Sequence, residues 1–568
     1  MKASDYVAEF VAGQGVRHVY EMCGGMITHL LDSFGARDDI RVVSMHHEQA
    51  AGFAAEAGAR MTGIPGVAMA TSGPGATNLI TAIGSCYFDS VPVVFITGQV
   101  NTGELRGDSG VRQAGFQETD IVALTTPITK ASVQVTSADD LPGALASAFE
   151  VALSDRPGPV LLDIPMNVQR QDVDGVAGKV SGGSAREPLS VGPVIDSLAA
   201  ARRPMLLVGG GVRTAGAVDL LREVAVRADL PVALTLMGAD ALAFDDPMRV
   251  GLIGSYGNRW ANLAMGESDC ILVLGARLDV RQTGADLEAF RQGKTIIRVD
   301  IDQHQLDWRL PADVPVRADL SRFLSALMTR ADEVRTDRAA WHERIDQLRR
   351  AWPDGDELLD VEGINPASLM HAVSDAASGA SAFVTDVGQN QMWSAQSLRL
   401  GGGQRLLTSG GMGAMGFALP SAIGAALSGS GAPVVMIAGD GGMQVNIQEL
   451  ETVARLGLPI KMIVLNNRAL GMVRQFQDEL FESRYQSTLW GYGAPDFRSV
   501  AEAYGVSARQ VSSSGEIAGA LDWLFADPKV PGLLEVLLPQ ITMVRPKVTF
   551  GNPVFIMEPP PGRDASHG

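Results

Sequence analysis

Cysteine is scarce in this chain, and long apolar runs and an excess of basic residues are missing altogether. The three cysteines, Cys23, Cys86 and Cys270, lie far apart and show no metal-ligand spacing, which fits a reducing compartment. No apolar run approaches the length of a membrane span. The net charge of −18 disfavours nucleic acid and anionic membranes as partners.

The length and the first residues narrow the class of protein further. A chain of 568 residues exceeds a single hydrophobic core, so about two to four domains are expected. The chain begins MKASDYVAEF, with acidic residues where a secretory signal peptide needs an apolar core. We therefore expect a cytoplasmic enzyme that acts on small molecules.

Short apolar runs alternate with helix-like patterns along most of the chain, which is typical of a doubly wound parallel sheet. The alternation occurs in three stretches, so the sequence predicts an α/β protein with three doubly wound parallel-sheet domains. The predicted domains are residues 1–175, 188–332 and 363–540, followed by a tail at 541–568. The predicted strands are Val16–Tyr20, Arg41–Ser44, Gly66–Ala70, Val91–Thr97, Cys270–Leu274, Thr295–Asp300, Ala382–Thr385, Val434–Ile437 and Ile460–Leu465.

Composition marks the segments between these domains. Residues 174–187 are rich in Gly, Ser and charge, and are interpreted as a linker. Residues 331–362 are charged and helical in pattern, which predicts a second connector. The tail after Pro539 contains Pro-Pro-Pro-Gly near its end and is expected to be extended and partly disordered.

The most informative stretch is the turn Gly439-Asp440-Gly441-Gly442, followed after a helical segment by Asn466-Asn467. A buried strand is predicted before the glycine-rich turn and another before the asparagine pair. One carboxylate and one carboxamide at strand ends suit Mg²⁺, which also takes phosphate oxygens. The glycines allow close approach of a ligand, and the following helix N-terminus suits its phosphates. Gly-Asp-Gly alone is usually a turn, but the pair predicts a metal–diphosphate clamp.

The stretch from Gly439 to Asn467 resembles the diphosphate-binding motif of thiamine-diphosphate-dependent enzymes. It is most similar to the acetolactate synthase (acetohydroxyacid synthase) large-subunit branch, and the resemblance covers roughly residues 1–540. It implies pyrimidine-binding, central Rossmann-like and diphosphate-binding domains in that order. It also implies that Asp440, Asn467 and the Ala469 carbonyl bind Mg²⁺. The residues it assigns to thiamine diphosphate are Glu48, Pro74, Asn78, Gly388, Gln389, Asn390, Gly413, Met415, Gly439, Asp440, Gly441, Gly442, Asn467, Leu470, Gly471 and Met472.

Glu48 opens a predicted helix, where a glutamate is usually a favourable partner of the helix dipole. Its surroundings, RVVSMHHEQAAGFAAEAGARMTG, resemble the segment that carries the catalytic glutamate of the same enzymes. The resemblance implies that Glu48 hydrogen-bonds the aminopyrimidine ring of the cofactor and so promotes removal of the thiazolium C2 proton. It also implies catalytic positions at Gly25, Phe116 and Gln117.

The central domain resembles the flavin-binding domain of the synthases, so FAD is a possible further cofactor. A glycine-rich strand end and an acidic strand end also occur in any Rossmann-like unit. The matching positions are Gly210, Gly211, Gly275, Arg277 and Asp300. Arg281 matches the arginine that holds the carboxylate of the acceptor, a role that suits its forked donors; its alternative role is a surface salt bridge.

Several positions depart from the family pattern. In the anabolic synthases of this family, a tryptophan of the acceptor pocket stands at the position of Phe476, and a methionine of the same pocket stands at the position of Ser255. Both changes shorten an apolar side chain, which suggests an acceptor site roomier and more polar than pyruvate or 2-oxobutyrate requires. Met22-Cys23-Gly24-Gly25 replaces Tyr-Pro-Gly-Gly, Asn390 replaces a histidine, and residues 547–553 differ from the usual ending.

The resemblance therefore implies a carboligase that decarboxylates a 2-oxo acid, with pyruvate favoured, and transfers the acyl unit to an acceptor carbonyl. It implies a homodimer or homotetramer with active sites at the subunit interface, Glu48 and the clamp coming from different chains. A regulatory subunit is left open. The alternatives are a decarboxylase or C–C lyase on the same scaffold and a non-catalytic regulatory homologue. Gln117 and Arg281 favour ligation, and retention of Glu48, Asp440 and Asn467 favours catalysis.

Overall fold

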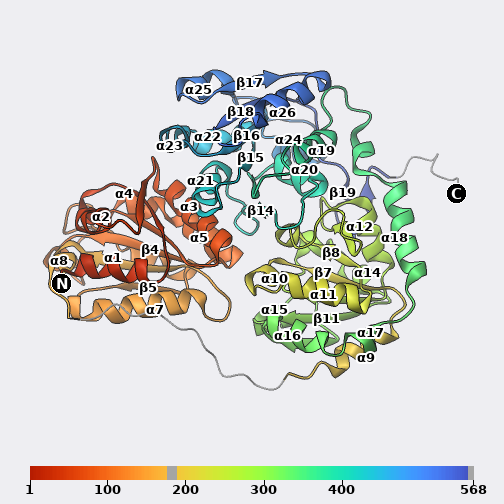
Figure 1. The fold of residues 1–568 in the computed structure, drawn as a ribbon, viewed down its shortest axis with the longest axis horizontal. Helices are drawn as coiled ribbons and strands as arrows, with labels where there is room; N and C mark the ends of the chain where they lie inside the picture. Colours follow the sequence, from red (N-terminus) through yellow and green to blue (C-terminus); the bar gives the residue numbers. More distant parts are fainter. Residues whose placement is uncertain (175–188, 561–568) are drawn as a thin grey trace.

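The computed structural model describes residues 1–174 and 189–560 (Figure 1). Within them lie three six-stranded sheets in which every neighbouring pair of strands is parallel, and one small antiparallel pair near the end. Helices cover both faces of each large sheet. This confirms the predicted α/β fold class with three doubly wound sheets. The linker predicted at 174–187 lies, apart from Asp174, outside the described residues.

The N-terminal sheet, at the left of Figure 1, has the strand order β2-β1-β3-β4-β6-β5. Successive side chains of a strand face opposite sides, so apolar runs give it two apolar faces. Helices α1, α2 and α7 cover one face, and α3 and α5 cover the other. The elements are β1 (His18–Met22), β2 (Arg41–Ser44), β3 (Gly66–Ala70), β4 (Val93–Gln99), β5 (Ala131–Gln134), β6 (Val160–Pro165), α1 (Ala3–Gly13), α2 (Thr28–Gly35), α3 (Glu48–Thr62), α5 (Ile80–Asp89) and α7 (Leu141–Leu153).

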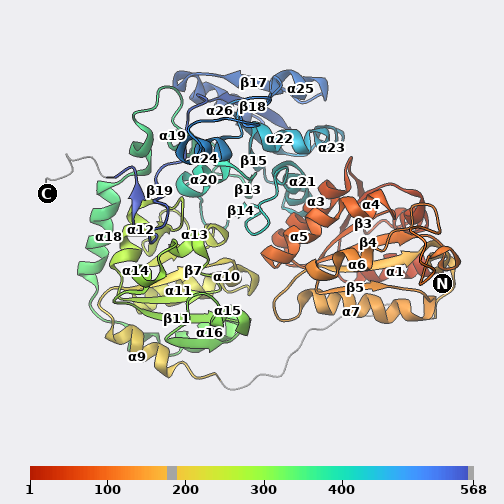
Figure 2. The same ribbon diagram turned by 180° about the vertical axis from the view of Figure 1, so that it is seen from behind.

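The central sheet has the order β12-β11-β10-β7-β8-β9. One face is covered by α9, α11 and α16, and the other by α12 and α18. Helix α18 confirms that the second connector is helical, and it runs along the outer edge of this domain (Figures 1 and 2). The elements are β7 (Pro204–Val208), β8 (Val232–Leu234), β9 (Arg249–Leu252), β10 (Cys270–Leu274), β11 (Thr295–Asp300), β12 (Val314–Arg317), α9 (Gly192–Ala200), α10 (Gly210–Thr214), α11 (Val218–Ala228), α12 (Arg259–Glu267), α13 (Val280–Thr283), α16 (Leu320–Met328) and α18 (Ala339–Ala351).

The third sheet has the order β14-β13-β15-β16-β18-β17. Helices α19, α20 and α26 pack on its outer face. Helix α21 lies on its inner face and packs against α3 of the N-terminal domain, so the two domains share one apolar core. The elements are β13 (Ala382–Thr385), β14 (Arg405–Leu407), β15 (Val434–Gly439), β16 (Ile460–Asn466), β17 (Ala508–Val511), β18 (Gly532–Leu537), α19 (Pro366–Ala376), α20 (Gln389–Ser397), α21 (Ala418–Ser428), α22 (Asp440–Val445), α23 (Leu450–Leu456), α24 (Gly471–Leu480), α25 (Phe497–Ala503) and α26 (Ile517–Phe525).

The contact between α3 and α21 depends on a glycine, and both views show the two helices side by side (Figures 1 and 2). A Cβ atom added at Gly424 would lie 2.1 Å from the backbone oxygen of Ala54. We expect Gly424→Ala to lower the free energy of unfolding by about 1–3 kcal/mol, because the two backbones must separate. Urea unfolding measures this change. Gly519→Ala on α26 is the matched control, since its Cβ would meet nothing within 4 Å, and an equal loss there would contradict the explanation.

The C-terminal tail differs from the prediction of an extended, partly disordered segment. Residues 541–560 pack against the body of the protein and contain a short antiparallel pair, β19 (Lys547–Val548) and β20 (Met557–Glu558). Val544 is buried in the outer core of the third domain, and Val554 is buried in the core of the central domain. The prediction was therefore wrong for this part of the tail, because apolar residues spaced widely among prolines do bury; residues 561–568 lie outside the described residues.

The predicted Gly-Asp-Gly-Gly turn is also shorter than expected. Strand β15 continues through Gly439, and α22 begins at the next residue, Asp440. Asp440 therefore lies at the first turn of a helix rather than in a loop. Among the described residues, no helix combines the length and apolar character needed to cross a membrane.

Candidate functional site

One cavity of about 1030 Å³ lies where the three domains meet. Its wall includes the residues that follow the carboxyl ends of β13, β15 and β16 in the third domain and of β7, β10 and β11 in the central domain. Ligands of open α/β sheets bind at this end of the strands. The cavity is large enough for a cofactor and a substrate together.

Most of the predicted site residues line this cavity. They come from segments far apart in the sequence, as the resemblance implied. Those that line it are Gly210, Gly211, Ser255, Gly275, Arg277, Arg281, Asp300, Gly388, Gln389, Asn390, Gly413, Met415, Gly439, Asp440, Gly441, Gly442, Asn467, Ala469, Leu470, Gly471, Met472 and Phe476.

Asp440 and Asn467 lie together at the ends of two neighbouring strands, β15 and β16. The Asp440 carboxylate accepts hydrogen bonds from the amides of Gly441, at 3.0 Å, and Ala469, at 3.1 Å. Burial raises the pKa of Asp440 to about 6, and these hydrogen bonds oppose the rise. A cation at the carboxylate would stabilise its charged form.

The Asn467 amide is oriented by a hydrogen bond that its Nδ2 donates to Gln389 Oε1 at 2.9 Å. This contact uses the nitrogen and leaves the carbonyl oxygen as a metal ligand. In the described part of the chain, no three His, Cys, Asp or Glu side chains gather as ligands. A metal at Asp440 would therefore also take the amide oxygen of Asn467 and backbone oxygens, a donor set that suits Mg²⁺.

The glycines beside Asp440 form a cradle that a side chain would fill. A Cβ at Gly441 would lie 2.5 Å from Leu470 Cδ2 and 3.0 Å from Met415 Cε. A Cβ at Gly442 would lie 2.3 Å from Asp386 Oδ1. Only glycine fits at these positions, and the backbone is thereby brought to the cavity wall.

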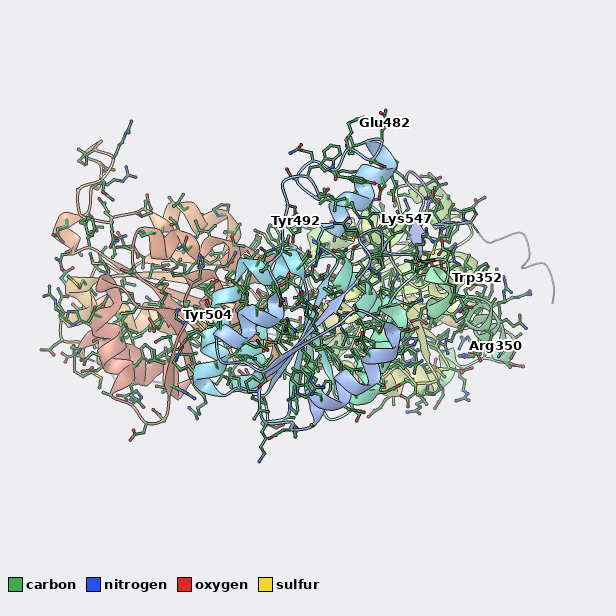
Figure 3. All side chains as sticks on the ribbon, turned by 90° about the horizontal axis from the view of Figure 1, so that it is seen from above. Arg350, Trp352, Glu482, Tyr492, Tyr504 and Lys547 are labelled. Atoms are coloured by element: carbon green, nitrogen blue, oxygen red, sulfur yellow. The ribbon has the colours of Figure 1, made fainter. Side chains whose placement is uncertain are left out.

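Asp386 was missed by the sequence reasoning. It follows β13, and its buried carboxylate accepts hydrogen bonds from the amides of Gly416, at 3.0 Å, and Ala418, at 2.9 Å. It therefore fixes the start of α21 behind the cavity. Its place after a predicted strand was the available signal. Tyr492, whose side chain forms a hydrogen bond with Asp440, was also missed. It lies in an irregular segment before α25 (Figure 3), where the sequence gives no pattern that predicts a site residue.

The predicted residues of the N-terminal domain form a second group that does not line the cavity. Glu48, at the first position of α3, accepts a hydrogen bond from Asn78 Nδ2 at 2.9 Å. A Cβ at Gly73 would lie 3.0 Å from that of Gln117, and the neighbouring Phe116 is 79% exposed. The members of this group are Gly25, Glu48, Pro74, Asn78, Phe116 and Gln117. In a single chain, Glu48 therefore does not line the cavity that Asp440 lines.

The cavity mouth holds the predicted substrate residues. The Ser255 hydroxyl donates to the Arg281 carbonyl oxygen at 3.3 Å, and the Ser255 amide donates to the same oxygen at 2.7 Å. Phe476 projects from α24 and is 46% exposed. Ser255 therefore lies directly beside the backbone of the arginine.

The tail, which had no predicted role, adds Lys547, Val548 and Phe550 to the cavity wall. Lys547 Nζ lies 2.6 Å from Glu479 Oε2 of α24, and Figure 3 shows Lys547 below the projecting segment that carries Glu482. The backbone oxygen of Thr542 accepts a hydrogen bond from Gln389 at 2.9 Å. The tail therefore supports the side chain that orients Asn467.

Sequence models of the thiamine pyrophosphate enzymes match all three domains. The N-terminal TPP binding domain matches residues 1–124, the central domain matches residues 191–327, and the C-terminal TPP binding domain matches residues 386–536. The chain therefore belongs to the thiamine pyrophosphate enzyme family.

Similar curated proteins include acetolactate synthases from bacteria, an archaeon and plants. The acetolactate synthase large subunit of Parasynechococcus marenigrum is 40% identical over 88% of this chain and 81% of its own length. The acetolactate synthase isozyme 2 large subunit of Escherichia coli is 37% identical over 97% of this chain and 98% of its own. A probable acetolactate synthase large subunit of Methanocaldococcus jannaschii is 35% identical over 95% and 92%. Within its family, the chain is an acetolactate synthase-like carboligase that depends on thiamine diphosphate.

Proposed function

We propose that this enzyme binds thiamine diphosphate through Mg²⁺, decarboxylates pyruvate and joins the acetyl unit to a second carbonyl compound. The observation that carries the proposal is the pairing of Asp440 with Asn467 at adjoining strand ends, beside a glycine cradle. Asp440, Asn467 and the Ala469 carbonyl would hold the metal. The backbone at 388–390 and 440–442 would receive the diphosphate.

Bound thiamine diphosphate would supply the nucleophilic carbon and the electron sink for the reaction. Glu48 would hold a proton at the aminopyrimidine ring, and Arg281 would bind the carboxylate of the acceptor. In the overall reaction the C1–C2 bond of pyruvate breaks and CO₂ leaves. A bond forms between C2 and the carbonyl carbon of the acceptor, whose oxygen takes up a proton. Mass-spectrometric identification of the product tests this reaction and separates it from simple decarboxylation.

The separation of Glu48 from the cavity supports a site completed by a second chain. We infer a homodimer, or a dimer of dimers, in which Glu48 of one chain meets Asp440 of the other. Mixing chains that carry Glu48→Gln with chains that carry Asp440→Ala tests this. Each variant alone should be inactive, but the mixture should regain about a quarter of wild-type activity. Half of the dimers in the mixture contain one chain of each kind, and each such dimer has one intact site out of two. Two inactive variants that stay inactive after co-refolding, while forming mixed dimers, would exclude a shared site.

The part of the cavity that the central domain lines supports FAD as a further cofactor. A Cβ at Gly209 would lie 2.2 Å from the backbone oxygen of Gly275, so the two strand-end loops meet without side chains between them. Asp300 lies at the end of the next strand, β11. Three such strand ends suit a dinucleotide. The absorption spectrum of the purified protein, and the stoichiometry of any flavin it carries, test this assignment.

We also propose that the acceptor is bulkier or more polar than pyruvate. Phe476→Trp and Ser255→Met restore larger side chains at the mouth. Each should raise the ratio of kcat/KM for pyruvate over a larger acceptor by about tenfold or more, because methylene-scale changes are worth about 1–3 kcal/mol in discrimination. Competition between two acceptors with labelled pyruvate measures the ratio. A wild-type enzyme that forms acetolactate rapidly from pyruvate alone would contradict the proposal.

We also infer the cellular compartment of the protein and consider a partner subunit. Its three cysteines form no disulfide, which suits a cytoplasmic enzyme. Several bacterial relatives are named large subunits, which implies a smaller partner in those proteins. Co-purification from the natural source decides whether this chain takes such a partner.

A further inference from the structure

The segment Thr408–Met415, called here the glycine loop, forms one wall of the cavity, with Ser409, Gly410, Gly411, Met412, Gly413 and Met415 lining it. It begins directly after β14 and leads into α21. Inside the loop, the Ala414 amide donates to Ser409 Oγ at 3.2 Å. The position of the loop therefore depends on what its two ends contact.

The N-terminal domain holds the first end of the glycine loop. Asp89, the last residue of α5, accepts hydrogen bonds from the amide of Gly410 on Oδ2 at 2.9 Å and from the amide of Gly411 on Oδ1 at 2.7 Å. Arg60 Nη1 donates to the backbone oxygen of Thr408 at 2.9 Å. Three consecutive peptide groups of the loop region are thus bound by residues more than 300 positions away in the sequence.

The two residues that hold the loop are buried and paired with each other. Arg60 Nη2 lies 2.8 Å from Asp89 Oδ2, and the same nitrogen also contacts Glu56. The side chains of Arg60 and Asp89 are 9% and 2% exposed. Hydrogen bonds to a charged acceptor in such a place are strong, and loss of one partner leaves the other buried without compensation.

The loop has no space to shift toward either neighbouring domain. A Cβ at Gly411 would lie 2.7 Å from Phe88 Cβ, and a Cβ at Gly410 would lie 2.3 Å from Met237 Sδ of the central domain. At its far end, Asp386 binds the amide of Gly416. Met415 stands between these two anchors, with its Cε 3.0 Å from the Cβ position of Gly441.

We propose that Asp89, oriented by Arg60, is a positioning residue for the thiamine diphosphate site. By binding the amides of Gly410 and Gly411 it sets the course of the glycine loop, and so the place of Met415 against the cofactor. The proposal rests on the function proposed above. It assigns to the N-terminal domain a role in its own chain's cavity, separate from the role of Glu48 at the surface shared with the second chain.

The test compares Asp89→Asn with wild type at saturating thiamine diphosphate and Mg²⁺. The carboxylate of Asp89 offers two acceptor oxygens, one to each of the amides of Gly410 and Gly411. An asparagine offers only one, and its NH₂ group would face the other amide, which is also a donor. We expect kcat per bound cofactor to fall about 10- to 100-fold, while the Kd for thiamine diphosphate changes less than about threefold, because the diphosphate clamp is intact. Asp38→Asn is the matched control, since Asp38 is exposed in the same domain and does not line the cavity, and it should retain wild-type kcat.

Gly411→Ala provides a second variant in case Asp89→Asn does not fold. It crowds Phe88 and displaces the loop without removing a charge, so the same fall in kcat with retained cofactor binding is expected. A folded Asp89→Asn or Gly411→Ala enzyme with wild-type kcat would overturn the positioning role. Wild-type enzyme without any turnover dependent on thiamine diphosphate would instead overturn the proposed function.

Discussion

Glu48→Gln is expected to lower kcat by about 100- to 10,000-fold, the range that a positioned acid–base group contributes. The glutamine keeps the size of the side chain and can still contact Asn78, so the helix start should keep its structure. It cannot exchange a proton with the aminopyrimidine ring. The measurement is the rate of CO₂ release from pyruvate by enzyme saturated with thiamine diphosphate and Mg²⁺.

The control for this substitution is Glu502→Gln, which changes an exposed glutamate on α25 in the same chemical way. It should leave kcat unchanged. The affinity for thiamine diphosphate should fall only modestly in Glu48→Gln, because the diphosphate and metal contacts come from other residues. Turnover by Glu48→Gln within about tenfold of wild type, below the usual acid–base contribution, would remove Glu48 from the mechanism.

Asp440→Ala is expected to weaken Mg²⁺ binding by at least about 100-fold, since even indirect partners of metal ligands matter by 10- to 100-fold. Without the metal, no cation balances the charge of the diphosphate at this end of the cavity. Thiamine diphosphate should therefore no longer bind at micromolar concentrations. Isothermal titration of the stripped protein with thiamine diphosphate, with and without Mg²⁺, measures both effects.

Asp375→Ala is the matched control for this change, because Asp375 is exposed on α19 and does not line the cavity. It should bind both ligands like wild type. The Asp440→Ala substitution leaves the amides of Gly441 and Ala469 without this acceptor, so thermal unfolding of the variant must show that it keeps its fold. Unaltered Mg²⁺-dependent binding in Asp440→Ala would show that the metal lies elsewhere.

The sequence predicted the fold because buried parallel strands are almost continuously apolar. It misplaced the strand ends where polar residues are buried. Strand β1 runs on through Glu21, whose carboxylate accepts a hydrogen bond from Ser44 Oγ at 2.6 Å. Strand β4 likewise runs on to Gln99, which donates to Asp163. A polar residue satisfied by a neighbouring strand looks like a strand end in the sequence.

The proximity of Asp440 and Asn467 was predictable, because both residues lie at the ends of strands that are adjacent in the sheet. Contacts between domains were not. Asp89 binds the glycine loop only because α3 packs against α21, and nothing in the local sequence around Asp89 announces that packing. The tail was misjudged for the same reason, since Val544 and Val554 are buried by surfaces supplied from two different domains.

The most direct test of the proposed reaction is to incubate the stripped protein with ¹³C-labelled pyruvate and a panel of carbonyl acceptors and to identify the products by mass spectrometry. We expect labelled CO₂ and a labelled 2-hydroxy-3-oxo product or related acyloin only when both thiamine diphosphate and Mg²⁺ are restored. A protein that binds neither, or that consumes no 2-oxo acid when both are present, would contradict the proposed reaction.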